Sequence, residues 1–340
     1  MTRPRAVVVG LGGPELSDAE RHLLQDGQPL GAILFARNVV DREQLRRLTG
    51  AVRDALGRDD APVLVDQEGG RVARLRPPVW RRYPPARAIA DVASADPDVD
   101  LATALARDVA ERIALDLVEV GIDVVCAPVL DLGLPAADRI IGDRAFGAAP
   151  ERVAALGRAA IEGALAGGCI PVVKHVPGHG RADVDSHVAL PVVTASAALL
   201  RATDWLPFRA LADAPALMIA HVVYTSFDPE RPASCSSVIV DDVVRGELGM
   251  TGLLFSDDVD MGALSGTAGE RVAAVLAAGC DVALQCNGRL GDIEAGIAAA
   301  PPLTDAAWER YEDARAAART PQQLAARMAA LDVALAPLET

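Results

Sequence analysis

The sequence CIPVVKHVPGHGRADVDSH, from Cys169 to His187, joins a short apolar run to a loop crowded with titratable side chains. The run over residues 169–173 has the length and composition of a buried strand, and Pro177-Gly178 predicts a turn after it. Three of the chain's five histidines fall in this stretch, together with a lysine and two aspartates. Polar groups directly after a buried strand are typical of the active-site end of an α/β barrel.

Seven further aliphatic runs of strand length lie along the chain, with helix-like segments between them. Most do not alternate polar with apolar residues, as expected for parallel strands buried on both faces. The eight runs span residues 6–11, 31–36, 62–65, 124–130, 169–173, 216–220, 252–255 and 281–286. Eight strands alternating with helices predict a single (β/α)8 TIM barrel of class α/β, rather than two domains.

Helix boundaries fit between these runs. Ser17-Asp-Ala-Glu20 has the pattern of a capping box, and Asp41 can cap a helix that reaches Leu56 and ends near Gly57. Further helices are predicted over residues 101–120, 151–166, 238–248, 270–278, 305–319 and 322–335. We therefore expect one domain over residues 1–340, with C-terminal helices at about 303–337 packed across the outside of the barrel.

Composition limits the classes of function. Hydrophobic residues make up 51% of the 340 residues and aromatic residues only 3%, so aliphatic side chains must build the core. The net charge of −14 argues against a nucleic-acid-binding or anionic-membrane surface, although it allows a local basic pocket. Five scattered cysteines and the lack of a signal-peptide pattern favour a cytoplasmic protein, and no cysteine pair suggests zinc. We expect a monomer without metal or other cofactor.

Polar residues follow nearly every predicted strand. Because barrel chemistry lies at the carboxyl ends of the strands, these residues predict a pocket for a polar substrate. In chain order they are Asp66, Asp131, Arg144 in a long loop, Lys174, His175, His221, the three acids Asp257, Asp258 and Asp260, and finally Gln285 and Asn287.

The segment FSDDVDM offers a carboxylate that could act as a nucleophile or a base. Asp257 and Asp258 point to opposite faces if the strand continues, so one of them is expected to face the pocket and the other to meet the helical layer or cap a helix. Asp185 and His187 have the pattern of an acid/base pair, since a carboxylate can orient an imidazole that exchanges a proton near neutral pH.

The remaining polar groups suit the binding of hydroxyls. Lys174 and Arg144 can hydrogen-bond hydroxyls or an anionic group, and Asp66 can accept hydrogen bonds from two sugar hydroxyls. Such a pocket needs no metal.

Four motifs, in order, resemble those of family 3 glycoside hydrolases, most closely the bacterial β-N-acetylglucosaminidase branch. They are VDQEGGRVARL at residues 65–75, IIGDRAFG at 140–147, KHVPGHGRADVDSH at 174–187 and FSDDVDM at 255–261. GAILFARNV at residues 31–39 also matches that branch. The resemblance extends from about residue 6 to about residue 290, and a Val at position 176, where the family often has Phe, is a small departure.

The resemblance implies a retaining double displacement on a terminal β-linked N-acetylglucosamine from peptidoglycan fragments, with a role in cytoplasmic cell-wall recycling. Asp257 would be the nucleophile, and His187, oriented by Asp185, would be the acid/base on a loop, residues 178–187, that moves to deliver it. The implied substrate-binding residues are Asp66, Arg74, Arg144, Lys174 and His175.

Other functions remain open at this point. A metal hydrolase would use His175, His179, His187 and Asp185, but the spacing lacks a tight helical pair. A Schiff-base lyase would use Lys174, which leaves FSDDVDM without a clear role. A glycoside phosphorylase would differ only in using phosphate in place of water. A non-catalytic sugar-binding protein would need neither Asp257 nor the Asp185–His187 pair.

Overall fold

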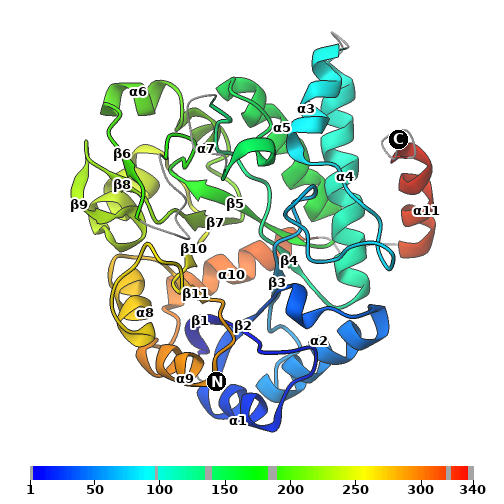
Figure 1. The fold of residues 1–340 in the computed structure, drawn as a ribbon, viewed down its shortest axis with the longest axis vertical. Coiled ribbons are helices and arrows are strands. Elements are labelled where there is room, and N and C mark those ends of the chain that lie inside the picture. Colours follow the sequence, from blue (N-terminus) through cyan, green and yellow to red (C-terminus); the bar gives the residue numbers. More distant parts are fainter. Residues whose placement is uncertain (1–2, 96–98, 135–139, 183–189, 319–322, 336–340) are drawn as a thin grey trace.

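A computed structural model describes residues 3–95, 99–134, 140–182, 190–318 and 323–335 of the chain. Its centre is a closed barrel of eight parallel strands surrounded by helices (Figure 1). The strands are β1 (Arg5–Gly10), β2 (Pro29–Leu34), β3 (Val63–Val65), β4 (Val124–Val125), β5 (Ile170–Val176), β7 (Ala216–Ile219), β10 (Leu253–Asp258) and β11 (Val282–Gln285). Each overlaps one predicted run, and β11 pairs with β1 to close the ring, which confirms the (β/α)8 barrel.

The strands are apolar on both faces because each face meets other apolar side chains. In β1, Val7 and Val9 pack between the barrel and its helices, whereas Val8 points into the barrel, where it belongs to the cluster that includes Ile33 and Leu64. This double burial explains why most of the runs do not alternate in hydropathy.

Helices cover the outside of the barrel. They are α1 (Asp18–Gly27), α2 (Arg42–Leu56), α3 (Ala86–Ala95), α4 (Val99–Glu119), α5 (Pro150–Ala166), α6 (Ala197–Ala202), α7 (Leu206–Ala210), the π-helix Val238–Glu247, α8 (Ala268–Ala277) and α9 (Leu290–Ala299). The capping box of α1 is present: the Ser17 hydroxyl accepts from the Glu20 N–H at 3.3 Å, and the Glu20 carboxylate accepts from the Ser17 N–H at 2.9 Å. Asp41 is the N-cap of α2, and its carboxylate accepts from the Gln44 N–H at 2.8 Å.

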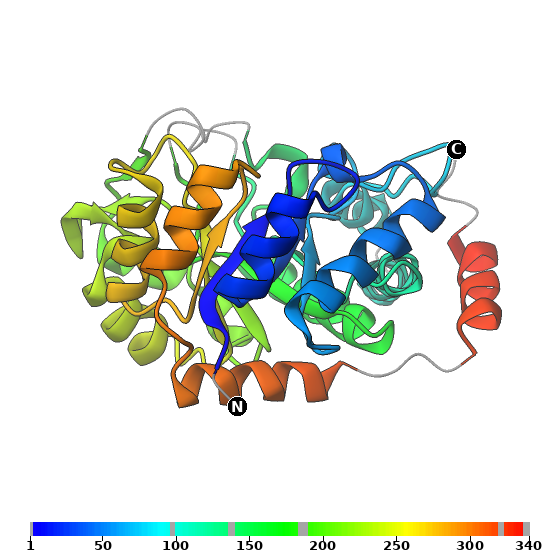
Figure 2. The same ribbon diagram turned by 90° about the horizontal axis from the view of Figure 1, so that it is seen from below.

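Two more helices follow α9 in the described part of the chain. Helix α10 (Asp305–Ala317) lies across the amino-terminal end of the barrel (Figure 2), and Ala307, Tyr311 and Ala314 join the apolar cluster inside it. Helix α11 (Leu324–Leu335) packs beside α4, where Arg327 pairs with Glu111 at 2.6 Å. No helix among the described residues is both long and apolar enough to cross a membrane.

A small second sheet, which the sequence did not predict, lies next to the barrel at the left of Figure 1. It consists of β6 (Val192–Val193), β8 (Val223–Tyr224) and β9 (Asp228–Pro232). The Tyr224 hydroxyl donates to the carbonyl of Gly178 at 2.9 Å. The sheet therefore supports the turn that follows β5, next to the polar residues of the site.

Candidate active site

The carboxyl ends of the strands surround a cavity of about 320 Å³. Six predicted site residues line it: Asp66, Arg74, Arg144, Lys174, His175 and Asp257. They come from β5, β10 and the loops after β3 and β4, which are far apart in sequence and meet here because parallel strands share one carboxyl end. Strand β5 extends to Val176, so Lys174 and His175 belong to the strand itself rather than to the loop after it.

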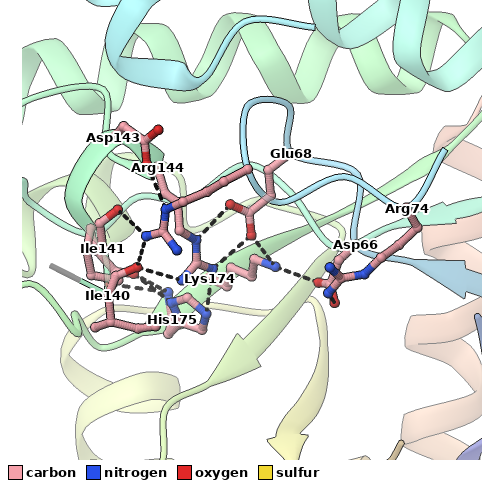
Figure 3. Close-up of polar contacts among 11 residues, drawn as sticks. Asp66, Glu68, Arg74, Ile140, Ile141, Asp143, Arg144, Lys174 and His175 are labelled. Atoms are coloured by element: carbon pink, nitrogen blue, oxygen red, sulfur yellow. Dashed lines mark hydrogen bonds and ion pairs between the residues drawn. The ribbon is translucent and has the colours of Figure 1, made fainter. Parts of the chain in front are cut away.

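Lys174 lies at the centre of an ion-pair network (Figure 3). Its ammonium is 2.8 Å from Asp66 Oδ1 and 2.7 Å from Glu68 Oε1. Arg74 reaches the other Asp66 oxygen at 3.0 Å, and Arg144 forms two hydrogen bonds of 2.8 Å to Glu68. Two carboxylates and three cations thus hold each other in fixed positions, which gives the cavity a rigid polar wall.

The network also fixes the charge of its members. Burial alone would raise the pKa of Asp66, but Lys174 and Arg74 outweigh it and hold that pKa far below its usual value. Burial would lower the pKa of Lys174, yet Asp66 and Glu68 raise it well above the usual range. A lysine held as an ammonium is a poor nucleophile, so this environment opposes a Schiff-base reaction at Lys174.

His175 is oriented by a buried carboxylate. Its Nδ1 lies 2.6 Å from Asp131 Oδ2, and Asp131 Oδ1 accepts from the His179 N–H at 2.6 Å. Burial would raise the pKa of Asp131, but His175 and the His179 N–H lower it, so the carboxylate stays ionised. Because an ionised carboxylate only accepts, Nδ1 of His175 carries a proton and Nε2 faces Arg144 at 3.5 Å, at the wall of the cavity.

Asp257 is the second-to-last residue of β10, a strand that only β7 separates from β5 in the barrel. Its carboxylate accepts from the Asp258 N–H at 2.8 Å. Burial would raise the pKa of Asp257, but His175, His221, that N–H and Lys174 together lower it. The residue is therefore an ionised carboxylate at neutral pH, the form that a nucleophile requires.

The family model described as the N-terminal domain of glycosyl hydrolase family 3 matches residues 5–307. The β-hexosaminidase of Alkalilimnicola ehrlichii is 43% identical over 285 residues, which cover 83% of this chain and 80% of that protein. The chain belongs to glycosyl hydrolase family 3.

Solved family 3 structures agree with this membership. Native NagZ from Neisseria gonorrhoeae is 30% identical, with a TM-score of 0.88 and coverage of 100% of this chain and 99% of that one. The same protein in complex with N-trifluoroacetyl-D-glucosamine is 31% identical, with a TM-score of 0.85 and 97% coverage of both chains. The predicted resemblance to family 3 is confirmed, and the chain is a glycoside hydrolase that acts on a carbohydrate.

Two of the predicted residues of this family 3 enzyme, Asp185 and His187, lie outside the described residues, as do residues 183–187 of the loop 178–187. Their roles and the motion of that loop stay predictions. Among the described residues, no group of three His, Cys, Asp or Glu side chains could hold a metal ion. The metal-hydrolase set includes Asp185 and His187, so that alternative is not tested by the geometry.

Three residues of the site, Glu68, Asp131 and His221, have no role predicted from the sequence. Glu68 lies in the same motif as Asp66, two positions later, and this spacing was an available signal. His221 is buried and donates from Nε2 to the Asp258 carbonyl at 2.9 Å, while its Nδ1 accepts from the Ser234 hydroxyl at 2.7 Å. These bonds keep it beside Asp257.

The expectation that only one residue of the pair Asp257 and Asp258 faces the pocket is wrong, because both line the cavity. The Asp258 carboxylate accepts from the Asp260 N–H at 2.9 Å and the Cys286 N–H at 3.1 Å. Burial, together with the neighbouring Asp260 and Asp257, raises the pKa of Asp258 to about 7. The pKa values of these two neighbouring carboxyl groups are shifted in opposite directions, so Asp257 is the more fully ionised of the two at neutral pH.

Proposed function

We propose that this family 3 enzyme is a retaining exo-β-N-acetylglucosaminidase that removes terminal β-linked N-acetylglucosamine from peptidoglycan fragments, including those that end in an anhydro-muramic sugar. The β-hexosaminidase relative supports the reaction. The NagZ structure with N-trifluoroacetyl-D-glucosamine supports a sugar that bears an N-acyl group. A role in cell-wall recycling, a cytoplasmic location and a monomeric state are parts of the same proposal.

The observation that carries the proposal is the ionised Asp257 near the end of β10, in the same cavity as Lys174, Arg144 and His175. In a retaining reaction such a carboxylate attacks the anomeric carbon and forms a glycosyl-enzyme intermediate, which water then hydrolyses. The bond between Asp257 and the sugar forms as the bond to the leaving oxygen breaks, and the leaving oxygen takes a proton.

We assign that proton transfer to His187, with Asp185 as the residue that orients it. An imidazolium that gives up its proton becomes neutral, so it adds no negative charge beside a leaving group that is itself acidic. The neutral imidazole can then accept a proton from the water that attacks the intermediate.

The polar wall would bind the hydroxyls of the sugar. Lys174, Arg74 and Arg144 are already held by Asp66 and Glu68, so they offer donors in fixed directions with little loss of side-chain freedom. His175 presents Nε2 from a ring that Asp131 holds in place. Each of these groups contacts its partner before substrate arrives, as preorganised binding requires.

The test is release of nitrophenol from the β-N-acetylglucosaminide at neutral pH with EDTA present. Wild type is expected to turn over, and Asp257→Ala should lose roughly a thousandfold or more in kcat. Azide should then restore activity to Asp257→Ala and yield the α-glycosyl azide, because a small anion replaces the missing carboxylate. Asp260→Asn, altered at the same strand end, should retain turnover and show no azide effect.

Two further outcomes have defined meanings. A rate that requires phosphate, with a sugar 1-phosphate as product, would identify a phosphorylase instead. No turnover of any β-glycoside by folded wild type, together with sugar binding in calorimetry, would identify a non-catalytic binding protein. The pairing of each cation of the wall with a carboxylate favours hydrolysis, since it leaves little positive charge to attract phosphate.

A further inference from the structure

A second cleft, of about 840 Å³, adjoins the active-site cavity. Its walls come from the loop after β3 and from Asp143 in the loop after β4. Arg71 lines both the cleft and the active-site cavity, so the two spaces are neighbours on either side of this side chain. A substrate whose terminal sugar occupies the active-site cavity can therefore extend its remaining part into the cleft.

The cleft is rich in arginine. Of the described residues that line it, four are arginines, Arg71, Arg76, Arg81 and Arg82, and one is acidic, Asp143. This local excess of positive charge is notable in a chain whose net charge is −14. Guanidinium groups grouped in one concave surface are typical of sites that bind carboxylates or phosphates.

Two of the four arginines are held by acidic side chains. Arg71 Nε lies 3.0 Å from Asp143, and Arg81 lies 3.0 Å from Asp332 of α11. These pairs fix the positions of Arg71 and Arg81 but also neutralise much of their charge.

The other two arginines supply the net positive charge. Arg76 is exposed, and among the described residues it donates only to backbone carbonyls, those of Ala73 at 2.7 Å and Arg71 at 3.2 Å. Carbonyls orient a guanidinium without cancelling its charge. Arg82 is exposed as well, and within the described part of the chain it has no ion pair. Arg76 is thus held in place and, with Arg82, is able to bind an anion.

We propose that this cleft binds carboxylates on the leaving group, so the enzyme selects substrates that are acidic on the side of the bond opposite the terminal sugar. The proposal rests on the proposed function, since it needs the terminal sugar in the neighbouring cavity. The cleft, at about 840 Å³ against about 320 Å³ for the active-site cavity, is large enough for a sugar that carries an acidic peptide.

The test compares two pairs of substrates that share the same leaving hydroxyl. In the first pair, N-acetylglucosamine is β-1,4-linked to N-acetylmuramic acid or to its carboxamide. In the second, the muramic residue carries a short peptide that ends in a carboxylate or in an amide. We expect wild type to favour the acidic member of at least one pair in kcat/KM by roughly 5- to 10-fold, the size of one exposed charge-assisted contact. The pair that is discriminated shows whether the sugar or the peptide supplies the anion.

Matched variants assign the preference to the cleft. Arg76→Gln with Arg82→Gln should abolish the preference for the acidic substrate, and added salt should reduce it in wild type. Arg47→Gln with Arg209→Gln removes the same charge from exposed helix positions outside the cleft and should leave the preference intact. Thermal melting of both double variants checks that each is folded.

The outcomes separate this proposal from the one on which it rests. Turnover of the neutral nitrophenyl glycoside with equal rates on both members of each pair would overturn the cleft proposal alone. A preference that survives in the Arg76→Gln, Arg82→Gln variant would also overturn it. Absence of turnover on every substrate would overturn the proposed function itself.

Discussion

Asp131 holds the ring of His175 in place at the polar wall of the cavity. It is fully buried in the loop after β4, and it accepts hydrogen bonds from the ring of His175 and from the His179 N–H. We predict that Asp131→Asn lowers kcat/KM by about 10- to 100-fold. The amide has one acceptor oxygen, whereas the carboxylate accepts from both the His175 ring and the His179 N–H, so the two groups are no longer held together. Steady-state kinetics on the nitrophenyl glycoside, with sugar affinity from calorimetry, measures this loss.

Asp123, just before the same strand, provides the matched control. Its carboxylate accepts from the Val63 N–H at 2.8 Å and pairs with Arg53 at 3.1 Å, at the opposite end of the barrel. Asp123→Asn should lower the free energy of unfolding yet leave kcat/KM and sugar affinity at wild-type values. If both variants lose stability equally and neither loses activity or sugar affinity, Asp131 has only a structural role.

At the scale of elements, helix α10 closes the amino-terminal end of the barrel. Tyr311 is 1% exposed, packs in the inner apolar cluster and donates its hydroxyl to the Asp60 carbonyl. Tyr311→Ala should lower the free energy of unfolding by about 3 to 5 kcal/mol, as expected for loss of a buried aromatic side chain. Urea denaturation measures the change, and kcat/KM of the folded variant should match wild type because the active site lies at the other end.

Glu312, the next residue on α10, gives the comparison for that prediction. It is exposed and pairs with Arg315 at 3.0 Å on the surface, so Glu312→Ala should cost no more than about 0.5 kcal/mol. Similar unfolding free energies for Tyr311→Ala and wild type would show that α10 does not seal the barrel.

Elements were easier to predict from the sequence than the contacts between them. A run such as 252–255 is a strand because it is apolar and bounded by a glycine, and both signals are local. The second sheet escaped because β6 and β8 are only two residues long, too short for a periodic signal. Glu68 and Asp131 were not assigned roles because their partners lie 76 and 44 positions away, at Arg144 and His175. Residues so far apart in sequence come into contact only when the barrel closes, so no local pattern indicates such contacts.

At the scale of the whole molecule, stability should respond to pH through opposing groups. Four carboxyl groups have lowered pKa values in the folded protein, those of Asp66, Glu68, Asp131 and Asp257. Their contribution to stability is present above the unfolded value of about 4 and is lost as the pH falls further. Burial lowers the pKa of His179 and His221, which removes stability as the pH falls through the ordinary histidine value of about 6.5.

Asp258 acts in the opposite direction over part of the same range. Its pKa is raised to about 7, so its contribution is fully present below the unfolded value of about 4 and is lost as the pH rises through about 7. Asp258→Asn removes this contribution and keeps an oxygen that can accept from the Cys286 N–H. As the pH falls from about 8 to about 5, wild type gains this contribution and the variant does not. The free energy of unfolding of the variant should therefore fall by on the order of 1 to 3 kcal/mol relative to wild type.

Urea unfolding of wild type and Asp258→Asn across that range tests the prediction. Asp213→Asn is the charge-matched control: Asp213 pairs with Arg158 on the surface at 2.6 Å, and this contact lowers its pKa, so it titrates below the range tested. Its difference from wild type should stay constant between about pH 8 and about pH 5. Parallel pH profiles for wild type and Asp258→Asn would mean that Asp258 is ionised throughout, and the cavity would then hold a second carboxylate beside Asp257 at neutral pH.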